Sequence, residues 1–171
     1  MQTNLVERYA NTEYGREAEA ILRKCVHCGF CTATCPTYQL LGDELDGPRG
    51  RIYQIKEILE GSTPTASTQG HLDRCLTCRS CETTCPSGVD YGRLADIGRK
   101  IVEDEVGRSL TETLIRKALI FVIPNRPLFG FLMRLGQLFR PLMPSAIRRK
   151  IPLRTSSSSW PQSTHTRKML V

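Results

Sequence analysis

The chain of 171 residues has few aromatic side chains and no long apolar run. Phe, Trp and Tyr make up 6% of it, and a chain with few large rings fills a hydrophobic core poorly. No stretch of about eighteen or more apolar residues occurs, which argues against a transmembrane helix. The first 24 residues carry several glutamates and no apolar core segment, which argues against a secretory signal.

Cysteine, in contrast, is unusually frequent, with eight residues in the chain. Because nothing indicates export, we expect the protein to be cytoplasmic, where thiols stay reduced. In that compartment metal binding or redox work is a better explanation of clustered cysteines than disulfide bonds are.

Acidic side chains are almost missing from the last third of the chain. Residues 1–107 contain 12 Lys and Arg against 16 Asp and Glu, whereas residues 108–171 contain 12 Lys and Arg against Glu112 alone. A basic segment after an acidic module predicts a polyanionic or acidic partner: anionic lipid, nucleic acid or another subunit. All eight cysteines lie in the acidic part, so the metal chemistry and the basic surface are separate features.

The cysteines form one motif that occurs twice. Residues 25–36 and residues 75–86 both read C-x2-C-x2-C-x3-C-P, so every cysteine recurs 50 residues later. This spacing is typical of proteins that bind 4Fe-4S clusters, in which three cysteines bind one cube and the fourth binds the other. The predicted ligands of the first cluster are Cys25, Cys28, Cys31 and Cys85. The predicted ligands of the second cluster are Cys75, Cys78, Cys81 and Cys35.

Other interpretations of the motifs are less favoured. Structural zinc also uses four cysteines, but its sites usually pair two C-x2-C knuckles without a third cysteine or a following proline. His27, His71 and Asp73 could bind a metal, but four thiolates already complete each cluster, so we expect them to lie outside the ligand set. Arg74 and Arg79 add positive charge near the second motif, which would raise a cluster's reduction potential.

The apolar pattern predicts an all-α protein: an α-helical ferredoxin module for two clusters, then amphipathic helices and a disordered tail. Residues 1–107 show helical stripes around both motifs, with loops expected at 42–50 and 62–70 and a short helix near His71. The predicted domains are the ferredoxin module at 1–107, a basic helical region at 108–153, and a serine-rich tail at 154–171. With little apolar area, the module is expected to need its clusters for folding.

Residues 110–123 and 128–142 are predicted to be helical, with a break at the prolines between them. The second segment places its Leu and Phe residues along one face, with Arg134 and Gln137 opposite. A basic amphipathic helix can lie on a membrane surface, pack within a complex, or bind nucleic acid. All three alternatives stay open from the sequence.

The first motif and the stretch that follows it, residues 25–51, closely resemble the iron–sulfur subunits of bacterial glycolate oxidase, or glycolate dehydrogenase. The resemblance covers roughly residues 18–150, and the wider group includes the iron–sulfur subunits of anaerobic glycerol-3-phosphate dehydrogenase and heterodisulfide reductase. It implies two 4Fe-4S clusters that relay electrons from an FAD-binding subunit, which oxidises glycolate to glyoxylate, towards a membrane quinone or another acceptor. A contact at the inner membrane is implied in the same way.

Members of that family continue into a region with Cys-Cys-Gly repeats, whereas no cysteine follows Cys85 here, so we expect a shortened chain. The sequence contains no nucleophile–base set and no Gly-rich dinucleotide motif, and we therefore predict no catalytic residue and an electron-transfer role. The alternatives are a relay for another flavin dehydrogenase, acting on lactate or glycerol 3-phosphate, and an iron–sulfur regulator that binds nucleic acid through its basic tail.

Overall fold

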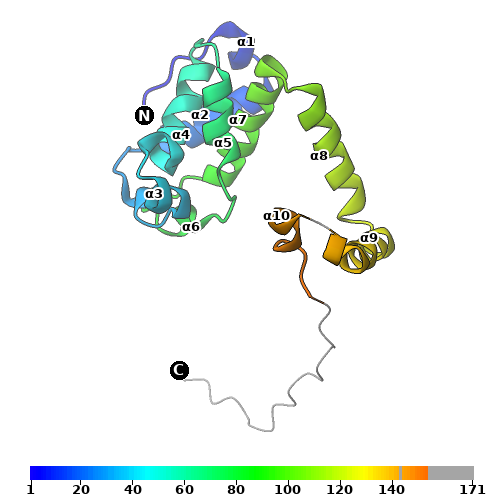
Figure 1. Ribbon diagram of the computed structural model, residues 1–171. Helices are drawn as coiled ribbons and strands as arrows, with labels where there is room; N and C mark the ends of the chain where they lie inside the picture. Colours follow the sequence, from blue (N-terminus) through cyan, green and yellow to red (C-terminus); the bar gives the residue numbers. More distant parts are fainter. Residues whose placement is uncertain (143, 154–171) are drawn as a thin grey trace, which may run out of the picture. The chain divides into compact units, whose positions relative to one another are not determined.

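The computed structural model describes residues 1–142 and 144–153, and every regular element in this part of the chain is a helix (Figure 1). The all-α prediction is therefore confirmed for these residues. The chain divides into two compact units, Met1–Ser109 and Leu110–Val171. The predicted disordered tail at 154–171 lies outside the described residues, and the predicted domain boundaries stay predictions.

The first unit consists of helices joined by short loops. Two single turns of 3-10 helix, η1 (Phe30–Thr32) and η2 (Glu44–Asp46), lie between them. The α-helices in chain order are α1 (Glu7–Ala10), α2 (Glu13–Lys24), α3 (Pro36–Leu41), α4 (Pro48–Leu59), α5 (Ala66–Asp73), α6 (Ser80–Thr83) and α7 (Tyr91–Val106).

Helix α7 is the centre of this unit, because it packs against α2, α4 and α5 (Figure 1). Its predicted apolar stripe, including Leu94 and Val102, is buried. Gly98 lets α4 approach closely, since a Cβ atom at that position would lie 2.6 Å from the Ile55 side chain. Each aliphatic side chain buried in this way stabilises the fold by roughly 1.5–3 kcal/mol.

Two of the predicted loops are shorter than expected. Pro48 begins α4 instead of belonging to a loop, because proline lacks the N–H that the first helical turn leaves unpaired. Helix α5 begins at Ala66, well before His71, because Thr65 and Thr68 form a reciprocal capping box at its start. The polar composition of residues 62–70 hides this helix start.

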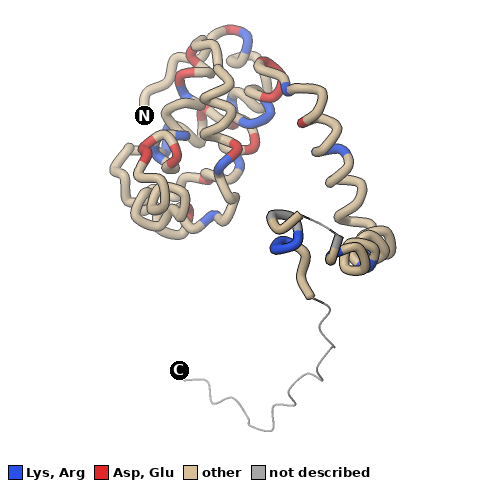
Figure 2. The backbone as a smooth tube through the Cα atoms, in the orientation of Figure 1, with Lys and Arg blue, Asp and Glu red and all other residues tan. Residues whose placement is uncertain are grey.

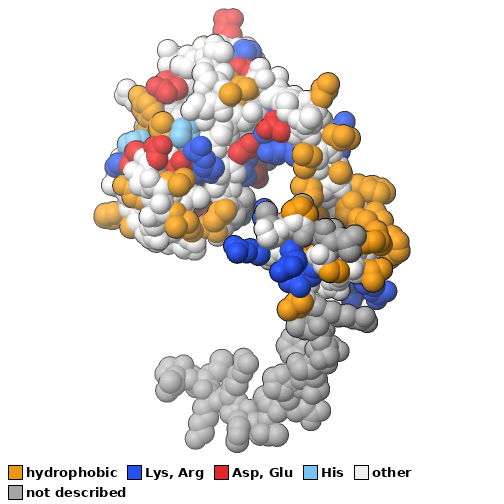
Figure 3. All heavy atoms as spheres, viewed as in Figure 1, with side chains coloured by type: hydrophobic (Ala, Val, Ile, Leu, Met, Phe, Trp, Pro, Cys, Tyr) orange, Lys and Arg blue, Asp and Glu red, His pale blue; other side chains and the backbone are white. Residues whose placement is uncertain are grey.

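The second unit contains α8 (Leu110–Val122), α9 (Arg126–Leu138), a 3-10 turn (Arg140–Leu142) and α10 (Ser145–Arg148). The two predicted helices and the break between them are confirmed, with Asn125 accepting a hydrogen bond from Leu128 N–H at the start of α9. No residue of α8 or α9 is buried. Apolar side chains gather over these helices in Figure 3, and Figure 2 shows their charges to be mostly basic.

Membrane spanning can be tested on the helices that the structure describes. None of them alone is long and apolar enough to cross a bilayer. Helices α8 and α9 meet the length and composition criteria only as a pair, which is bent by 110° between them.

Candidate cluster-binding site

The two cysteine motifs connect the helices of the first unit. Cys25 follows the last residue of α2, and Cys35 directly precedes α3. In the second copy Cys75 comes after α5, and Cys81 lies within α6. The turn η1 in the first motif contacts α6 in the second, so the fold brings the two copies together.

The backbone repeats the same unusual conformation in both motifs. His27 and Gly29 have φ values of 59° and 84°, and the residues 50 positions later, Thr77 and Arg79, have φ values of 55° and 58°. A left-handed residue other than glycine costs about 1–2 kcal/mol, so this strain needs compensation. Left-handed residues in such loops turn successive N–H groups inward into a concavity that binds anions, including iron–sulfur clusters.

One cavity in this region is lined by thiols from both motifs. Three of its cysteines come from the first copy, and the remaining two come from the second. Its other walls are mostly apolar, with Pro48, Ile52 and Val89 among them. The lining cysteines are Cys25, Cys28, Cys31, Cys81 and Cys85. The four predicted ligands of the first cluster therefore face one space, although they come from sequence positions 60 residues apart.

A second cavity is lined by the other predicted ligand set. Its cysteines are Cys35, Cys75, Cys78 and Cys81. Pro48, Cys81 and Tyr91 line both cavities and thus form a shared wall. Because each predicted set of four thiols lines one cavity, both cavities suit an anionic 4Fe-4S cluster, which has four thiolate ligands.

Equivalent cysteines of the two motifs are buried to a similar extent at some positions only. Cys28 and Cys78, which occupy the same place in the two motifs, are both exposed. Burial and the neighbouring Cys25 raise the pKa of Cys31 to about 11. Burial and the neighbouring Cys31 raise the pKa of Cys81 to about 12. These two thiols hold their protons at neutral pH until a metal displaces them.

Several side chains near the cavities escape detection in the sequence. Thr37 Oγ1 lies 3.1 Å from Cys35 Sγ, and Tyr91 donates its hydroxyl hydrogen to Cys75 Sγ over 3.5 Å. Arg49 lies over Gly29, where a Cβ atom would be 2.7 Å from its guanidinium. The position of Thr37 two residues after Cys35 is a weak sequence signal, but Tyr91 and Arg49 carry none.

A buried ion-pair network lies beside the second cavity. Arg51 is 1% exposed, and its guanidinium bonds to the Asp46 carboxylate at 3.4 Å, to Thr37 Oγ1 at 3.2 Å and to the His71 carbonyl at 2.7 Å. Burial alone would raise the pKa of Asp46. The hydrogen bond from His71 and the charge of Arg74 outweigh burial and hold that pKa below its usual value.

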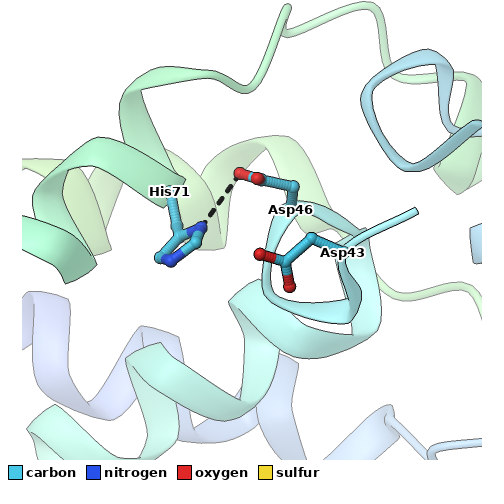
Figure 4. Close-up of side chains that lie close together, drawn as sticks. All are labelled: Asp43, Asp46 and His71. Atoms are coloured by element: carbon cyan, nitrogen blue, oxygen red, sulfur yellow. Dashed lines mark hydrogen bonds and ion pairs between the residues drawn. The ribbon is translucent and has the colours of Figure 1, made fainter. Parts of the chain in front are cut away.

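Asp43, Asp46 and His71 lie close enough together to suggest a metal site (Figure 4). The Asp46 carboxylate, however, already binds Arg51 and Arg74, with an Arg74 distance of 2.8 Å. Two guanidinium groups repel a metal cation, so this cluster is an ion-pair network and not a metal centre.

The histidines and Asp73 lie outside the two ligand sets. His71 bonds to Asp46 across 3.1 Å and lines neither cavity. Asp73 pairs with Arg108 at 2.8 Å. His27 lines the first cavity, where its Nδ1 is buried without a hydrogen-bond partner among the described residues. Burial, with the charge of Arg49, lowers the pKa of His27, so the ring is neutral at pH 7. The predicted cations also differ, since Arg79 lines the second cavity whereas Arg74 binds Asp46.

Comparison with known proteins agrees with this geometry. Residues 21–89 match the family model described as a 4Fe-4S dicluster domain, which confirms 4Fe-4S clusters as the predicted cofactors and fits their predicted number. The chain is 56% identical over its whole length to the glycolate oxidase iron–sulfur subunit of Escherichia coli (strain K12). It is 42% identical over 104 residues, or 60% of the chain, to the probable glycolate oxidase iron–sulfur subunit of Bacillus subtilis (strain 168).

A more distant relative is the succinate dehydrogenase iron–sulfur subunit of Paracoccus denitrificans, 29% identical over 48% of the chain and 35% of that protein. The chain spans 42% of the length of the Escherichia coli relative and 23% of the Bacillus subtilis relative. The resemblance expected from the motifs is thereby confirmed: the chain contains a 4Fe-4S dicluster domain and is similar to iron–sulfur subunits of glycolate oxidase, along its whole length in the Escherichia coli case.

Proposed function

We propose that this chain is the electron-relay part of a glycolate-oxidising complex. In this proposal it accepts electrons one at a time from an FAD-binding subunit, which converts glycolate to glyoxylate, and passes them to a downstream acceptor. The observation that carries the proposal is the pair of adjoining cavities, each lined by four predicted cysteine ligands drawn from both motifs. The similarity to glycolate oxidase iron–sulfur subunits supports the choice of substrate.

The proposed ligand sets are Cys25, Cys28, Cys31 and Cys85 for the first cluster, and Cys35, Cys75, Cys78 and Cys81 for the second. A 4Fe-4S cluster supplies one-electron chemistry, which matches stepwise relay from a two-electron flavin. The protein positions the thiolates, and the apolar walls of the first cavity exclude water. The shared wall of Pro48, Cys81 and Tyr91 keeps the two ligand sets adjacent.

Anaerobic reconstitution with iron and sulfide tests the relay directly. The chain should bind about eight iron and about eight sulfide ions, and its broad visible absorbance should bleach when dithionite is added. Zinc bound in place of iron, or absorbance that dithionite leaves unchanged, would remove the proposal. Co-purification with a flavoprotein, followed by comparison of glycolate, lactate and glycerol 3-phosphate as electron donors, tests the substrate.

We further propose that the chain is cytoplasmic and makes a peripheral contact with the inner membrane through α9. Phe131 and Leu138 are 61% and 71% exposed on its apolar face. Arg134, Arg140 and Arg148 line an open hollow next to this helix, and charges of this kind fit the phosphates of anionic lipids. A helix with one apolar face and one cationic face is typical of an in-plane membrane anchor.

Sedimentation with lipid vesicles tests this contact. The chain should bind vesicles that contain anionic lipid, and the Phe131→Asp variant should bind roughly tenfold or more weakly, because a large apolar group no longer enters the bilayer. Ser62→Asp is the matched control, since it adds the same charge at an exposed residue of the first unit and should lose much less affinity. Equal losses in both variants would show that charge alone, and not insertion of α9, holds the chain on the vesicle.

A further inference from the structure

A side-chain hydrogen-bond donor to cysteine sulfur lies at the second cavity. Tyr91 donates its hydroxyl hydrogen to the Cys75 sulfur over 3.5 Å. Thr37 Oγ1 lies 3.1 Å from the Cys35 sulfur, but it donates its hydrogen to the Asp46 carbonyl at 2.8 Å and accepts one from Arg51, so it is no donor to that sulfur.

The first cavity has no such donors. In the described part of the chain, no side-chain hydrogen bond reaches the sulfur atoms of its four proposed ligands, and its walls include Val26, Phe30 and Ile52. Tyr91 lines this cavity too, but its hydroxyl is directed to Cys75. The shared wall is therefore polar only towards the second cavity.

Cations do not cancel this difference between the cavities. Arg49 at the first cavity is paired with Glu44 at 2.6 Å, and Arg51 at the second is paired with Asp46 at 3.4 Å. Arg49 has a carboxylate of its own, whereas Arg51 shares Asp46 with Arg74, so the positive field is reduced less at the second cavity. The Tyr91 hydroxyl and this positive charge therefore favour the same cavity.

A donor to a thiolate sulfur stabilises the reduced cluster more than the oxidised one, because the reduced cluster is more negative by one charge. Such donors therefore raise a reduction potential, whereas an apolar surrounding lowers it. We infer that the hydroxyl of Tyr91 makes the second cavity the site of higher potential, so that electrons pass from the first ligand set to the second.

This inference rests on the function and the ligand sets proposed above. Each transfer moves one electron across the shared wall, so that one cluster is oxidised by one unit and the other is reduced by one unit. No bond is made or broken, and no proton is required. Tyr91 acts as a positioning residue, since it is not a ligand.

Anaerobic potentiometric titration of the reconstituted chain, followed by electron paramagnetic resonance, tests the inference. Wild type should show two one-electron transitions. Tyr91→Phe should lower the higher midpoint potential and leave the lower one in place. We expect this substitution to shift the electron's preference for the second site by about threefold, where a tenfold shift corresponds to about 59 mV for one electron.

Tyr9→Phe is the matched control, because Tyr9 is also a buried tyrosine whose hydroxyl bonds to a partner, Glu105, and it lines neither cavity. It should leave both potentials unchanged. The transitions are assigned to their sites with Cys28→Ser and Cys78→Ser, which alter the exposed ligand of each set in turn.

A shift of the lower transition alone, or no shift in a Tyr91→Phe variant that keeps its iron, would overturn the inference. If Tyr91→Phe loads iron poorly, assignment of the higher wild-type transition to the first ligand set would overturn it. These outcomes are distinct from failure of the proposed function, in which the wild-type chain itself would not assemble two reducible clusters.

Discussion

The Cys85→Ala variant should lose the cluster next to the first motif while it keeps the cluster next to the second. Cys85 belongs to the second motif by sequence, but its side chain faces the cavity that holds Cys25, Cys28 and Cys31. Three thiolates with no fourth ligand hold a 4Fe-4S cluster poorly, so bound iron should fall from about eight to about four ions per chain. Cys35→Ala should have the reciprocal effect, because Cys35 faces the second cavity.

Alkylation of free thiols followed by mass spectrometry identifies which cluster is lost. In Cys85→Ala the reagent should modify Cys25, Cys28 and Cys31, whereas Cys35 and the three remaining cysteines of the second motif stay protected. Labelling of Cys75, Cys78 and Cys81 instead would show that each motif binds its own cluster, and the crossed ligand sets would be wrong. Thr83→Ala is a suitable control, since it alters an exposed residue of the same motif and should leave all eight cysteines protected.

Loss of both clusters in a single cysteine variant would carry a different meaning. Cys81 lines both cavities, and the turn η1 of the first motif contacts α6 of the second. An emptied first cavity therefore removes support from the second. Iron retention measured at low temperature, before the remaining cluster is released, separates this mechanical coupling from shared ligation.

The proposed ligands could be found in the sequence because cluster chemistry requires cysteines at set spacings, and the duplication repeats them. The helical stripes were equally visible, since α2, α4 and α7 each bury one apolar face. The start of α5 was missed because its capping box is built from threonines in a polar stretch that resembles a loop. Local composition misleads where a single hydrogen-bonded cap decides the boundary.

The surroundings of the ligands could not be predicted in the same way. Tyr91 meets Cys75 because it begins α7, which packs against α5, and α5 ends two residues before Cys75. The spacing of 16 residues between Cys75 and Tyr91 does not predict that contact. Arg51 is an even less expected residue, because arginine is almost never fully buried unless it is paired. Its partner Asp46 lies in the turn η2, which the sequence predicts to be part of a loop.

Replacing Arg51 with methionine should be the most damaging single change outside the cysteines. The substitution keeps the buried volume but removes the cation between Asp46, Thr37 and the His71 carbonyl. Asp46 keeps Arg74 and His71, but three acceptors lose a donor inside the protein. Breaking a buried ion pair by removing one partner costs about 3–5 kcal/mol, and we expect a loss of unfolding free energy in this range.

Urea unfolding of the cluster-loaded chain under anaerobic conditions, followed by helical circular dichroism, measures this loss. The midpoint should fall while the slope of the transition stays constant, since the same surface is exposed on unfolding. Arg93→Met is the matched control: Arg93 pairs with Glu17 at 2.7 Å on the surface, where solvent screens the pair, and should lower the midpoint much less. Similar midpoints for Arg51→Met and Arg93→Met would show that the buried network adds no more stability than a surface pair.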